Sequence, residues 1–321
     1  MASFREFSRT ESWGSEAWKA LCKVRETTPL VQCITNFVSM DIMANSLLAA
    51  GASPAMVHAI EEILEFTSLS SALCINIGTL SPDWIFSMKA AAIRANECQK
   101  PWVLDPVGVG ATRFRTEKCI ELINLKPCVI RGNASEIMGV VGASIAPSKG
   151  VDTTRSSTDA LEAAKELARA AQTVVAVTGA VDLVTDGKRV LGVSNGVALM
   201  QRITATGCAV TALIAAFVSV NPNRVLESTA IALALFGLAG EMGAEKASGP
   251  ASLRMHLIDA LHMLDEASVM NRAGGVHHKQ EVSRNTKITW CFTKHQVLVL
   301  GLYLITLSRI TDLMESITGL M

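Results

Sequence analysis

The chain has 321 residues, of which 50% are apolar and 18% charged, and Lys+Arg and Asp+Glu each number 29. This composition excludes disorder over the whole chain and allows a sizeable core in one large α/β domain or two ordinary ones. A formal net charge of zero leaves no basic excess, so we expect no nucleic-acid partner. Weak charge repulsion between copies favours an oligomer.

The cysteines and the apolar runs narrow the class further. The eight cysteines are scattered without a C-x-x-C motif, which argues against a zinc site and against a disulfide framework. The polar N-terminus lacks the apolar core of a secretory signal. The longest apolar run near the C-terminus, 297–308, is shorter than the roughly 18–20 residues that span a bilayer. We therefore expect a reducing, cytoplasmic location and no membrane association.

Short apolar runs alternate with Ala-rich helical stretches over the first half of the chain. The runs are continuously apolar rather than alternating, which is typical of parallel strands covered on both faces. Helical patterns between them include 83–98 and 158–171. The alternation predicts a three-layer α/β fold with a mostly parallel central sheet. The predicted strands are 30–34, 54–57, 72–77, 102–105, 128–132 and 173–178.

The pattern changes after residue 178. Asp186-Gly187 stands between two apolar strands in 181–193, which predicts a hairpin with a type I′ turn. Long helical segments follow at 208–219, 224–244 and 252–270, and the first two are apolar enough to be buried nearly all round. Because no linker or repeat appears before 272, we predict one domain over 1–272, followed by an extension over 273–321.

A first candidate site follows the strand 102–105. Its last residue is Asp105, and Pro106, Gly108 and Gly110 come next. Ligands of open α/β sheets bind beyond the carboxyl ends of the strands, and a carboxylate there can hold Mg²⁺. The alternative is that Asp105 accepts hydrogen bonds from loop amides and has a structural role alone.

A second candidate site follows the next strand. Arg131 could clamp phosphate oxygens with its planar guanidinium, and Glu136 could supply a second oxygen ligand to the metal. The alternative is that Asn133 or Ser135 caps the following helix, with Glu136 complementing the helix dipole.

A small, Gly-containing turn at 204–207 leads directly into an Ala-rich helix. Its backbone N–H groups, including that of Gly207, could form an anion hole for a transferring phosphoryl group, although small residues before a buried helix also serve packing alone. Thr178 ends a strand and could touch nucleotide phosphates. Asn36 and Met56 lie on a plausible substrate side, but the first could be a turn residue and the second a core residue.

Seven segments, taken in order, resemble the hydroxyethylthiazole kinase family of the ribokinase-like superfamily, over roughly residues 26–272. The resemblance implies a three-layer α/β/α ribokinase-like fold. It also implies ATP-dependent, Mg²⁺-dependent phosphorylation of the hydroxyl of 4-methyl-5-(2-hydroxyethyl)thiazole in thiamine salvage, by a homotrimer with active sites between subunits. The matching segments are CITNFV (33–38), GASPAMV (51–57), LCINIGTL (73–80), VLDPVGVGAT (103–112), IRGNASEI (130–137), VTGAVDLVTDG (177–187) and ATGCAVTALIAAF (205–217).

The resemblance also implies roles for particular residues. Cys208 stands where many ribokinase-like enzymes have an Asp general base. Because a thiol is a poor proton acceptor unless it is ionised, we assign Cys208 to substrate positioning first and to proton transfer second. The remaining assignments are catalysis and Mg²⁺ organisation for Asp105, Mg²⁺ for Glu136, the thiazole for Met56, Gly207 and Asn36, and ATP for Arg131, Thr178 and Asn133, the last completing an Asn-x-x-Glu element.

Other readings stay open from the sequence. The chain could be a kinase for hydroxymethylpyrimidine or pyridoxal, a related nucleotide-dependent hydratase, or an inactive nucleotide-binding variant. The stretch after Arg272 matches nothing in the family pattern. Because the assigned residues all precede it, we expect 273–321 to be dispensable for the chemistry.

Overall fold

The computed structural model describes residues 12–144 and 157–278. The described residues all belong to one compact unit. The apolar run at 297–308 and most of the predicted extension therefore lie outside the described part of the chain.

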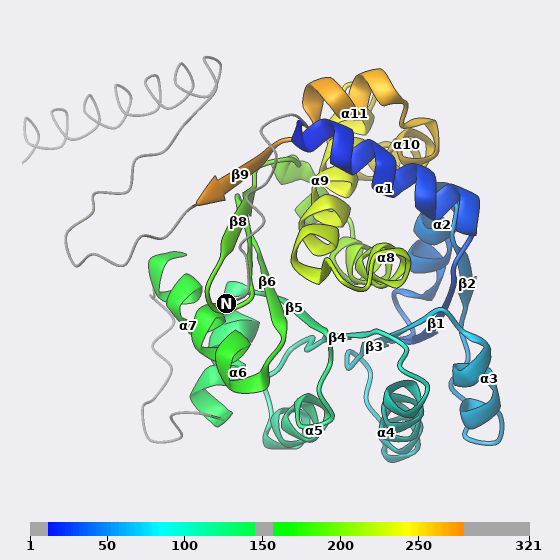
Figure 1. Ribbon diagram of the computed structural model, residues 1–321, viewed down its shortest axis with the longest axis vertical. Coiled ribbons are helices and arrows are strands. Elements are labelled where there is room, and N and C mark those ends of the chain that lie inside the picture. Colours follow the sequence, from blue (N-terminus) through cyan, green and yellow to red (C-terminus); the bar gives the residue numbers. More distant parts are fainter. Residues whose placement is uncertain (1–11, 145–156, 279–321) are drawn as a thin grey trace, which may run out of the picture. The chain divides into compact units, whose positions relative to one another are not determined.

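A nine-stranded sheet forms the centre of the described unit, in the order β2-β1-β3-β4-β5-β6-β7-β8-β9 (Figure 1). Strands β1 to β6 pair in parallel and β6 to β9 pair antiparallel. The mostly parallel sheet is confirmed. The strands are β1 Leu30–Ile34, β2 Ser53–Ala55, β3 Ala72–Asn76, β4 Trp102–Asp105, β5 Val129–Asn133, β6 Val174–Thr178, β7 Asp182–Thr185, β8 Val190–Val193 and β9 Gly275–His278.

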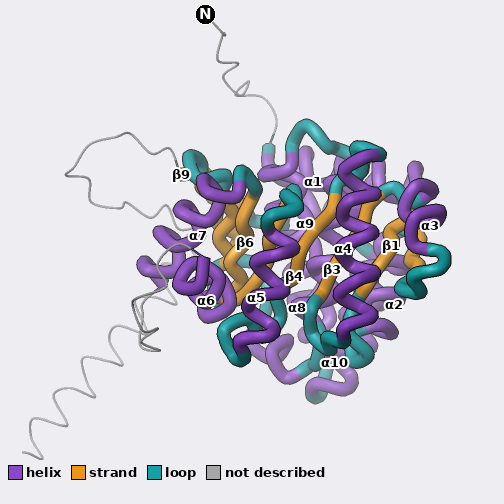
Figure 2. The backbone as a smooth tube through the Cα atoms, turned by 90° about the horizontal axis from the view of Figure 1, so that it is seen from below, coloured by secondary structure: helices purple, strands orange, loops and turns teal. Residues whose placement is uncertain are grey.

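Helices cover both faces of this sheet, so the three-layer architecture is also confirmed. One face carries α3 Ile63–Leu69, α4 Pro82–Glu97, α5 Arg113–Ile123, α6 Ala134–Ser144 and α7 Ser157–Ala171. Figure 2 looks onto this face. The other face carries α1 Trp13–Thr27, α2 Met40–Ala50, α8 Thr206–Val220, α9 Val225–Ala244, α10 Pro250–Met263 and α11 Glu266–Arg272, with the short 3-10 helix η1 Ala198–Arg202 nearby.

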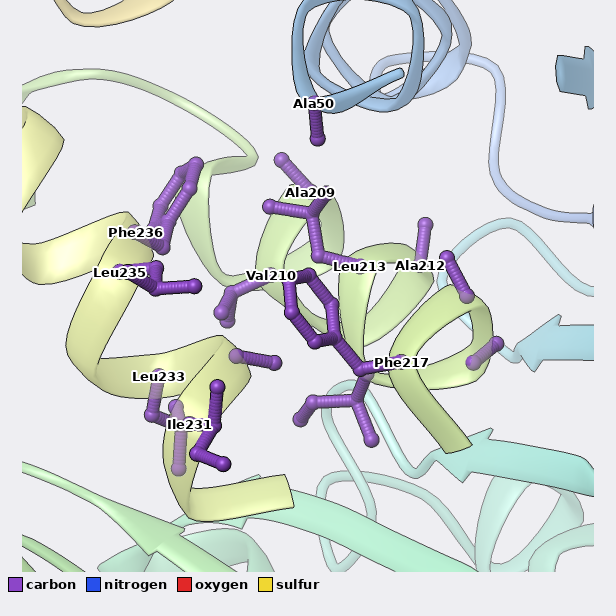
Figure 3. Packing of buried hydrophobic residues seen from close by; sticks show 14 of the residues in the cluster. Ala50, Ala209, Val210, Ala212, Leu213, Phe217, Ile231, Leu233, Leu235 and Phe236 are labelled. Carbon is purple, nitrogen blue, oxygen red and sulfur yellow. The ribbon is translucent and has the colours of Figure 1, made fainter. Parts of the chain in front are cut away.

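Helices α8 and α9 are buried nearly all round, as their composition predicts. Phe217 and Leu213 of α8 pack toward Ile231 and Leu235 of α9, with Ala50 of α2 close by (Figure 3). Among the described residues, α9 is the one helix long and apolar enough to cross a membrane, and most of it is buried inside the protein. Its apolar surface is accounted for by this core.

The structure differs from the sequence prediction in the hairpin and in the last long helix. Strands β7 and β8 pair antiparallel as predicted, but Thr185 pairs with Val190, so four residues form the loop. A type I′ turn needs positive φ at two central residues, whereas only Gly187 has it here, because the Asp186 carboxylate accepts the amides of Lys188 and Arg189 and shapes the loop. The predicted helix 252–270 is two helices, since Asp265 caps α11 by accepting from Ser268 N.

The sheet also continues past residue 272. Strand β9 pairs with β8, and the Asn195 side chain bonds both the Arg272 carbonyl and the Gly274 amide. The ordered fold thus includes a short piece of the predicted extension, which single-sequence patterning missed because four residues carry almost no periodic signal.

The strand order reverses beside β1. The chain passes from β1 to β2 on one side and then to β3 on the other side. Ligand crevices in open parallel sheets lie at such a switch point, outside the carboxyl ends of the strands. The fold therefore directs attention to the residues that follow β1, β3 and β4.

Candidate active site

Three polar residues lie on the same face of neighbouring strands at the carboxyl edge. Cys74, Val103 and Val129 belong to the core on the α8 side of the sheet. Because side chains alternate along a strand, the residues two positions later, Asn76, Asp105 and Arg131, also point toward α8. Asn76 pairs directly with Asp105 in the β3–β4 register. Leu104 pairs with Ile130 in the β4–β5 register, which brings the predicted Asp105 and Arg131 side by side.

Asp105 is fully buried and held through one oxygen. Its Oδ2 accepts from Asn76 Nδ2 and from Thr211 Oγ1, each at 2.9 Å, while its Oδ1 has no hydrogen-bond partner among the described residues. Burial raises the pKa of Asp105 to about 6, and the charge of Glu136 also raises it, against the opposing effect of Arg131 and the two hydrogen bonds. A buried carboxyl with a raised pKa and an oxygen that lacks a partner is typical of functional groups.

Arg131 is also buried and links Asp105 to the end of β6. Its Nη2 donates to Thr178 Oγ1 at 2.6 Å, and its Nη1 lies 3.8 Å from Asp105 Oδ2. Its Nε is buried without a partner in the described part of the chain. A Cβ on Gly207 would lie 2.6 Å from Nη1, so any larger residue at 207 would require the Arg131 guanidinium to shift. The structure thus places the predicted Arg131, Thr178 and Gly207 together.

Cys208 sits in the first turn of α8, whose N-cap residue Ala205 has the left-handed φ of 63°. Asn36 Nδ2 lies 3.5 Å from Cys208 Sγ. Burial first, and then the negative charge of Asp105, raise the pKa of the Cys208 thiol above its ordinary value despite opposing effects of Asn36, Asn76 and Arg131. A neutral thiol is a poor proton acceptor, which favours a positioning role for Cys208.

Asn36 shows the geometry of both interpretations given to it. Its Oδ1 accepts from Val38 N and Ser39 N, so it is a turn residue before α2. Its Nδ2 donates to Asn76 Oδ1 at 2.8 Å, which also joins it to the polar cluster around Asp105. Contact with a substrate stays a prediction.

Glu136 and Asn133 form a capping box at the start of α6. Asn133 Oδ1 accepts from Glu136 N, and Glu136 Oε2 accepts from Asn133 N, both at 2.9 Å. Glu136 Oε1 accepts from Gly108 N at 3.0 Å, which ties the β4 loop to α6. The alternative that Asn133 caps the helix and that Glu136 has a structural role at its start therefore describes the local geometry. A metal or ATP role for these two residues stays a prediction.

The residues present fit a loosely held Mg²⁺. No group of three His, Cys, Asp or Glu that could hold a metal occurs within residues 12–144 and 157–278. Mg²⁺, however, is usually bound through one or two carboxylates together with substrate phosphates and water. Asp105 Oδ1, which lacks a partner among the described residues, and the neighbouring Glu136 carboxylate are compatible with that mode of binding.

Met56 follows β2 and is half-buried against the core on the α8 side. This position is compatible both with a core residue and with a residue that contacts the substrate. β2 pairs with β1 in parallel, so Met56 and Asn36 leave the sheet at the same edge.

Four further residues complete the site, and the sequence reasoning did not assign them roles. Asn76 and Thr211 hold Asp105. Arg115 Nη1 donates to the carbonyls of Ile77 and Val107 and thereby joins two strand-end loops. Asp182 accepts from Gly179 N, and burial raises its pKa to about 6. Asn76 had a usable signal, because it is a polar residue at the end of a wholly apolar strand.

Comparison with known proteins identifies the family. Residues 21–267 match the model of the hydroxyethylthiazole kinase family. A protein of Arabidopsis thaliana named hydroxyethylthiazole kinase is 58% identical over 265 residues, which cover 83% of this chain and 96% of that protein. The solved structure of hydroxyethylthiazole kinase protein from Pyrococcus horikoshii superposes with a TM-score of 0.77 at 43% identity, covering 82% of this chain and 99% of that one.

A more distant structure shares the fold alone. Pyridoxal kinase from Staphylococcus aureus, solved in complex with ADP, superposes with a TM-score of 0.50 at 17% identity, covering 66% of this chain and 87% of that one. The ribokinase-like architecture is thus confirmed, while the higher identities distinguish the family within it. From the family match and from these relatives, the chain belongs to the hydroxyethylthiazole kinase family.

Proposed function

We propose that this protein transfers the γ-phosphoryl group of ATP to the hydroxyl of 4-methyl-5-(2-hydroxyethyl)thiazole, in thiamine salvage. Membership of the family carries the proposal, because the match spans residues 21–267 and includes the whole polar cluster around Asp105. The site supports it independently, since buried charged groups on β4 and β5 lie at the carboxyl edge of the sheet, where such sheets bind ligands, and connect through Asn76 and Asn36 to the switch point beside β1.

The chemical task is to place the alcohol oxygen in line with the γ-phosphorus and to stabilise the charge that spreads over the transferring group. Arg131 would engage ATP phosphates, with Thr178 fixing its guanidinium through the 2.6 Å hydrogen bond. The backbone amides at the start of α8 would face the same charge. Asn133 completes the expected ATP contacts at the β5 end, beside the α6 cap.

Asp105 and Glu136 are the residues that would hold Mg²⁺, which supplies charge neutralisation at the phosphates when bound. Asp105 contributes the free Oδ1, whereas Glu136 is already bonded through both oxygens to amides and would act through remaining lone pairs or through water. Cys208, Asn36, Gly207 and Met56 would shape the thiazole side of the cleft.

The comparisons and the site argue against the alternative functions, which are a kinase for another vitamin precursor and an inactive nucleotide-binding variant. A pyridoxal kinase shares only the fold at 17% identity, whereas the thiazole-kinase relative reaches 58%. An inactive nucleotide-binding variant is disfavoured because Asp105 and Arg131 remain in place and buried beside each other.

We also propose a homotrimer whose active sites lie between subunits. Phe37 and Val38 follow Asn36 directly and are 69% and 60% exposed, and the Phe37 ring centroid lies 4.8 Å from that of Trp84 in a tilted arrangement. Large apolar groups exposed beside a ligand-binding site are typical of a surface that another chain covers.

We also propose that the protein is located in the cytoplasm. The free cysteines of the described residues favour a reducing compartment.

One assay tests the function. Purified protein is incubated with Mg²⁺, ATP and either the hydroxyethyl thiazole, a hydroxymethylpyrimidine or pyridoxal, and phosphate ester formation is measured. We expect the thiazole alcohol to give a kcat/KM at least about 100-fold above the others, the discrimination expected when a pocket is built for one ligand's polar groups. Preference for pyridoxal, or ATP binding without turnover of any alcohol, would contradict the proposal.

A further inference from the structure

A chain of buried polar side chains crosses the carboxyl edge of the sheet from β1 to α8. Asn36 donates to Asn76 at 2.8 Å, Asn76 donates to Asp105 at 2.9 Å, and Thr211 donates to the same Asp105 oxygen at 2.9 Å. All four are buried, and Asn76, Asp105 and Thr211 completely so. Buried polar groups that satisfy one another in this way fix a single geometry.

The orientation of the Asn76 amide follows from its partners. Its Oδ1 accepts two N–H donors, Asn36 Nδ2 and Gly78 N, at 2.8 and 2.9 Å. An amide nitrogen cannot accept, so the oxygen must face those donors and the Nδ2 group must face Asp105. Asn76 therefore presents a donor to the carboxylate.

Thr211 donates to the same oxygen. It lies on α8, and its Oγ1 is 2.9 Å from Asp105 Oδ2 and 3.1 Å from the Gly207 carbonyl. A hydroxyl has one hydrogen, and a carboxylate accepts it more strongly than a carbonyl does. Two donors thus converge on Oδ2, while Oδ1 is left without a partner among the described residues.

We propose that Asn76 and Thr211 are positioning residues that hold Asp105 by its Oδ2 oxygen and so leave Oδ1 available for the phosphates and Mg²⁺. This inference rests on the proposed kinase function. The two residues touch no reacting atom themselves. They act through Asp105, because a partial rotation of the carboxylate about its Cβ–Cγ bond would break the hydrogen bonds from Asn76 and Thr211.

The test compares isosteric changes at Thr211. Thr211→Val removes the donor without changing the shape, and we expect kcat to fall about 10-fold, the usual result of losing one hydrogen bond to a charged group. Thr211→Ser keeps the hydroxyl and should recover most of that loss. Thr229→Val makes the same change at a buried threonine of α9 whose hydroxyl bonds only the Val225 carbonyl, and it should leave kcat unchanged.

A double-mutant cycle separates positioning from general damage. In the Asp105→Asn background, Thr211→Val should change kcat by less than about 2-fold, because the group through which it acts is gone. Asn76→Asp, which sets a second carboxylate against Asp105, should lower kcat at least as much as Thr211→Val. Full 10-fold loss in the Asp105→Asn background, or equal damage from Thr211→Ser, would overturn the inference.

A binding measurement supplies a readout that does not depend on turnover. Calorimetric binding of a non-hydrolysable ATP analogue is measured with and without Mg²⁺. Thr211→Val should weaken the Mg²⁺-dependent gain in affinity several-fold and leave metal-free binding unchanged, whereas equal weakening of both would overturn the inference. If the wild-type protein fails to phosphorylate the thiazole alcohol, the proposed function fails, but this binding comparison still decides the role of Thr211.

Discussion

Two acidic residues lie at the carboxyl ends of neighbouring strands of this sheet, and they differ in burial and in hydrogen bonding. Asp105 ends β4, is completely buried, and has a free Oδ1. Glu136 comes three residues after the end of β5, is half-buried, and uses both oxygens to accept backbone amides. Both were predicted from the same signal, an acid beside glycine at a strand end.

The residues that follow each strand explain the difference. Pro106 follows Asp105 and has no N–H, and the next helix does not begin until Arg113, so the carboxylate has no helix start to cap. Helix α6 begins at Ala134, directly after Asn133, which places Glu136 at the third helical position of a capping box. An acid near a helix start thus has a structural task that an acid before proline lacks. The comparison predicts that Asp105 serves chemistry and Glu136 serves mainly geometry.

The largest expected effect is that of Asp105→Asn. Removing a preorganised charge should lower kcat by at least about 100-fold. The variant should also be more stable than the wild type above pH 6. Because the folded-state pKa of Asp105 is about 6, against 3.8 ordinarily, the folded state binds its proton more tightly and the free energy of unfolding falls as pH rises through that interval, by roughly 1–3 kcal/mol.

Turnover and thermal unfolding at pH 4 and pH 8 check both parts. The stability gain of Asp105→Asn should be fully present at pH 8 and mostly lost near pH 4, where the folded-state carboxyl is protonated and only about half of the unfolded-state carboxyl is ionised. Near-normal kcat at saturating Mg²⁺ would remove Asp105 from the mechanism and end the distinction from Glu136.

Arg131→Lys should have the next largest effect. A guanidinium can engage Thr178 and phosphate oxygens at once, whereas an ammonium is a point charge that cannot reproduce the fork. We expect the KM for ATP to rise about 10-fold, as for one lost charged hydrogen bond, with a smaller change in the KM for the thiazole. Steady-state kinetics with each substrate varied in turn measures this. A change confined to the thiazole KM would show that the two sides of the cleft are assigned the wrong way round.

Glu136→Gln should be milder than Asp105→Asn. The amide nitrogen cannot accept from a backbone N–H, so either the Gly108 contact or the Asn133 contact is lost. We expect a loss of about 1 kcal/mol in unfolding free energy, as for a lost helix cap, and only a several-fold fall in kcat. Chemical denaturation and kinetics are compared on the same preparation. A 100-fold fall in kcat without a change in stability would make Glu136 a direct metal ligand.

Asp105 and Glu136 also show which features of the site could be predicted from the sequence and which could not. Continuous apolar strands and helical periodicity predicted the sheet and its two covering layers, because burial determines both. Asp105 and Arg131 could be placed together because parallel strands end at one edge. The capping box of Glu136 depends on where α6 begins, a boundary that patterning locates only to within a few residues.

Thr211 was harder still to assign, because its function depends on the packing of α8 over β4, an approach between residues 106 positions apart. Strand β9 was missed because its pairing partner, not its own four residues, defines it. Such long-range contacts are not encoded in local periodicity.

Cys208→Ser should have a small effect. Burial and Asp105 raise the pKa of the thiol, so it is neutral near pH 8 and cannot serve as a base there. Serine keeps a small polar group beside Asn36, and we expect kcat to stay within about 3-fold of the wild type, well inside the effect of losing general-base catalysis. The pH profile of kcat should keep its shape. Complete inactivation with ATP binding intact would argue for an essential thiolate.

The smallest expected effect on chemistry is that of shortening the chain. The assigned and proposed residues all lie before position 212, and the described unit ends at Gln280. A chain that ends at Gln280 keeps β9 on β8, whereas a chain that ends at Arg272 also loses that strand and the Gly274 contact with Asn195. An exposed sheet edge promotes association with other chains. The sequence at 297–307 is apolar, β-prone and uncharged, a pattern associated with aggregation.

We therefore expect the chain ending at Gln280 to match the full-length protein in kcat within about 2-fold, which is below the effect of any lost catalytic interaction, and to give a higher soluble yield. The chain ending at Arg272 should be less stable than the one ending at Gln280, because β8 becomes an unpaired edge. Kinase activity, trimer content by light scattering and soluble yield are measured for all three lengths. An inactive or monomeric chain ending at Gln280, beside an active full-length trimer, would make 281–321 part of the working fold.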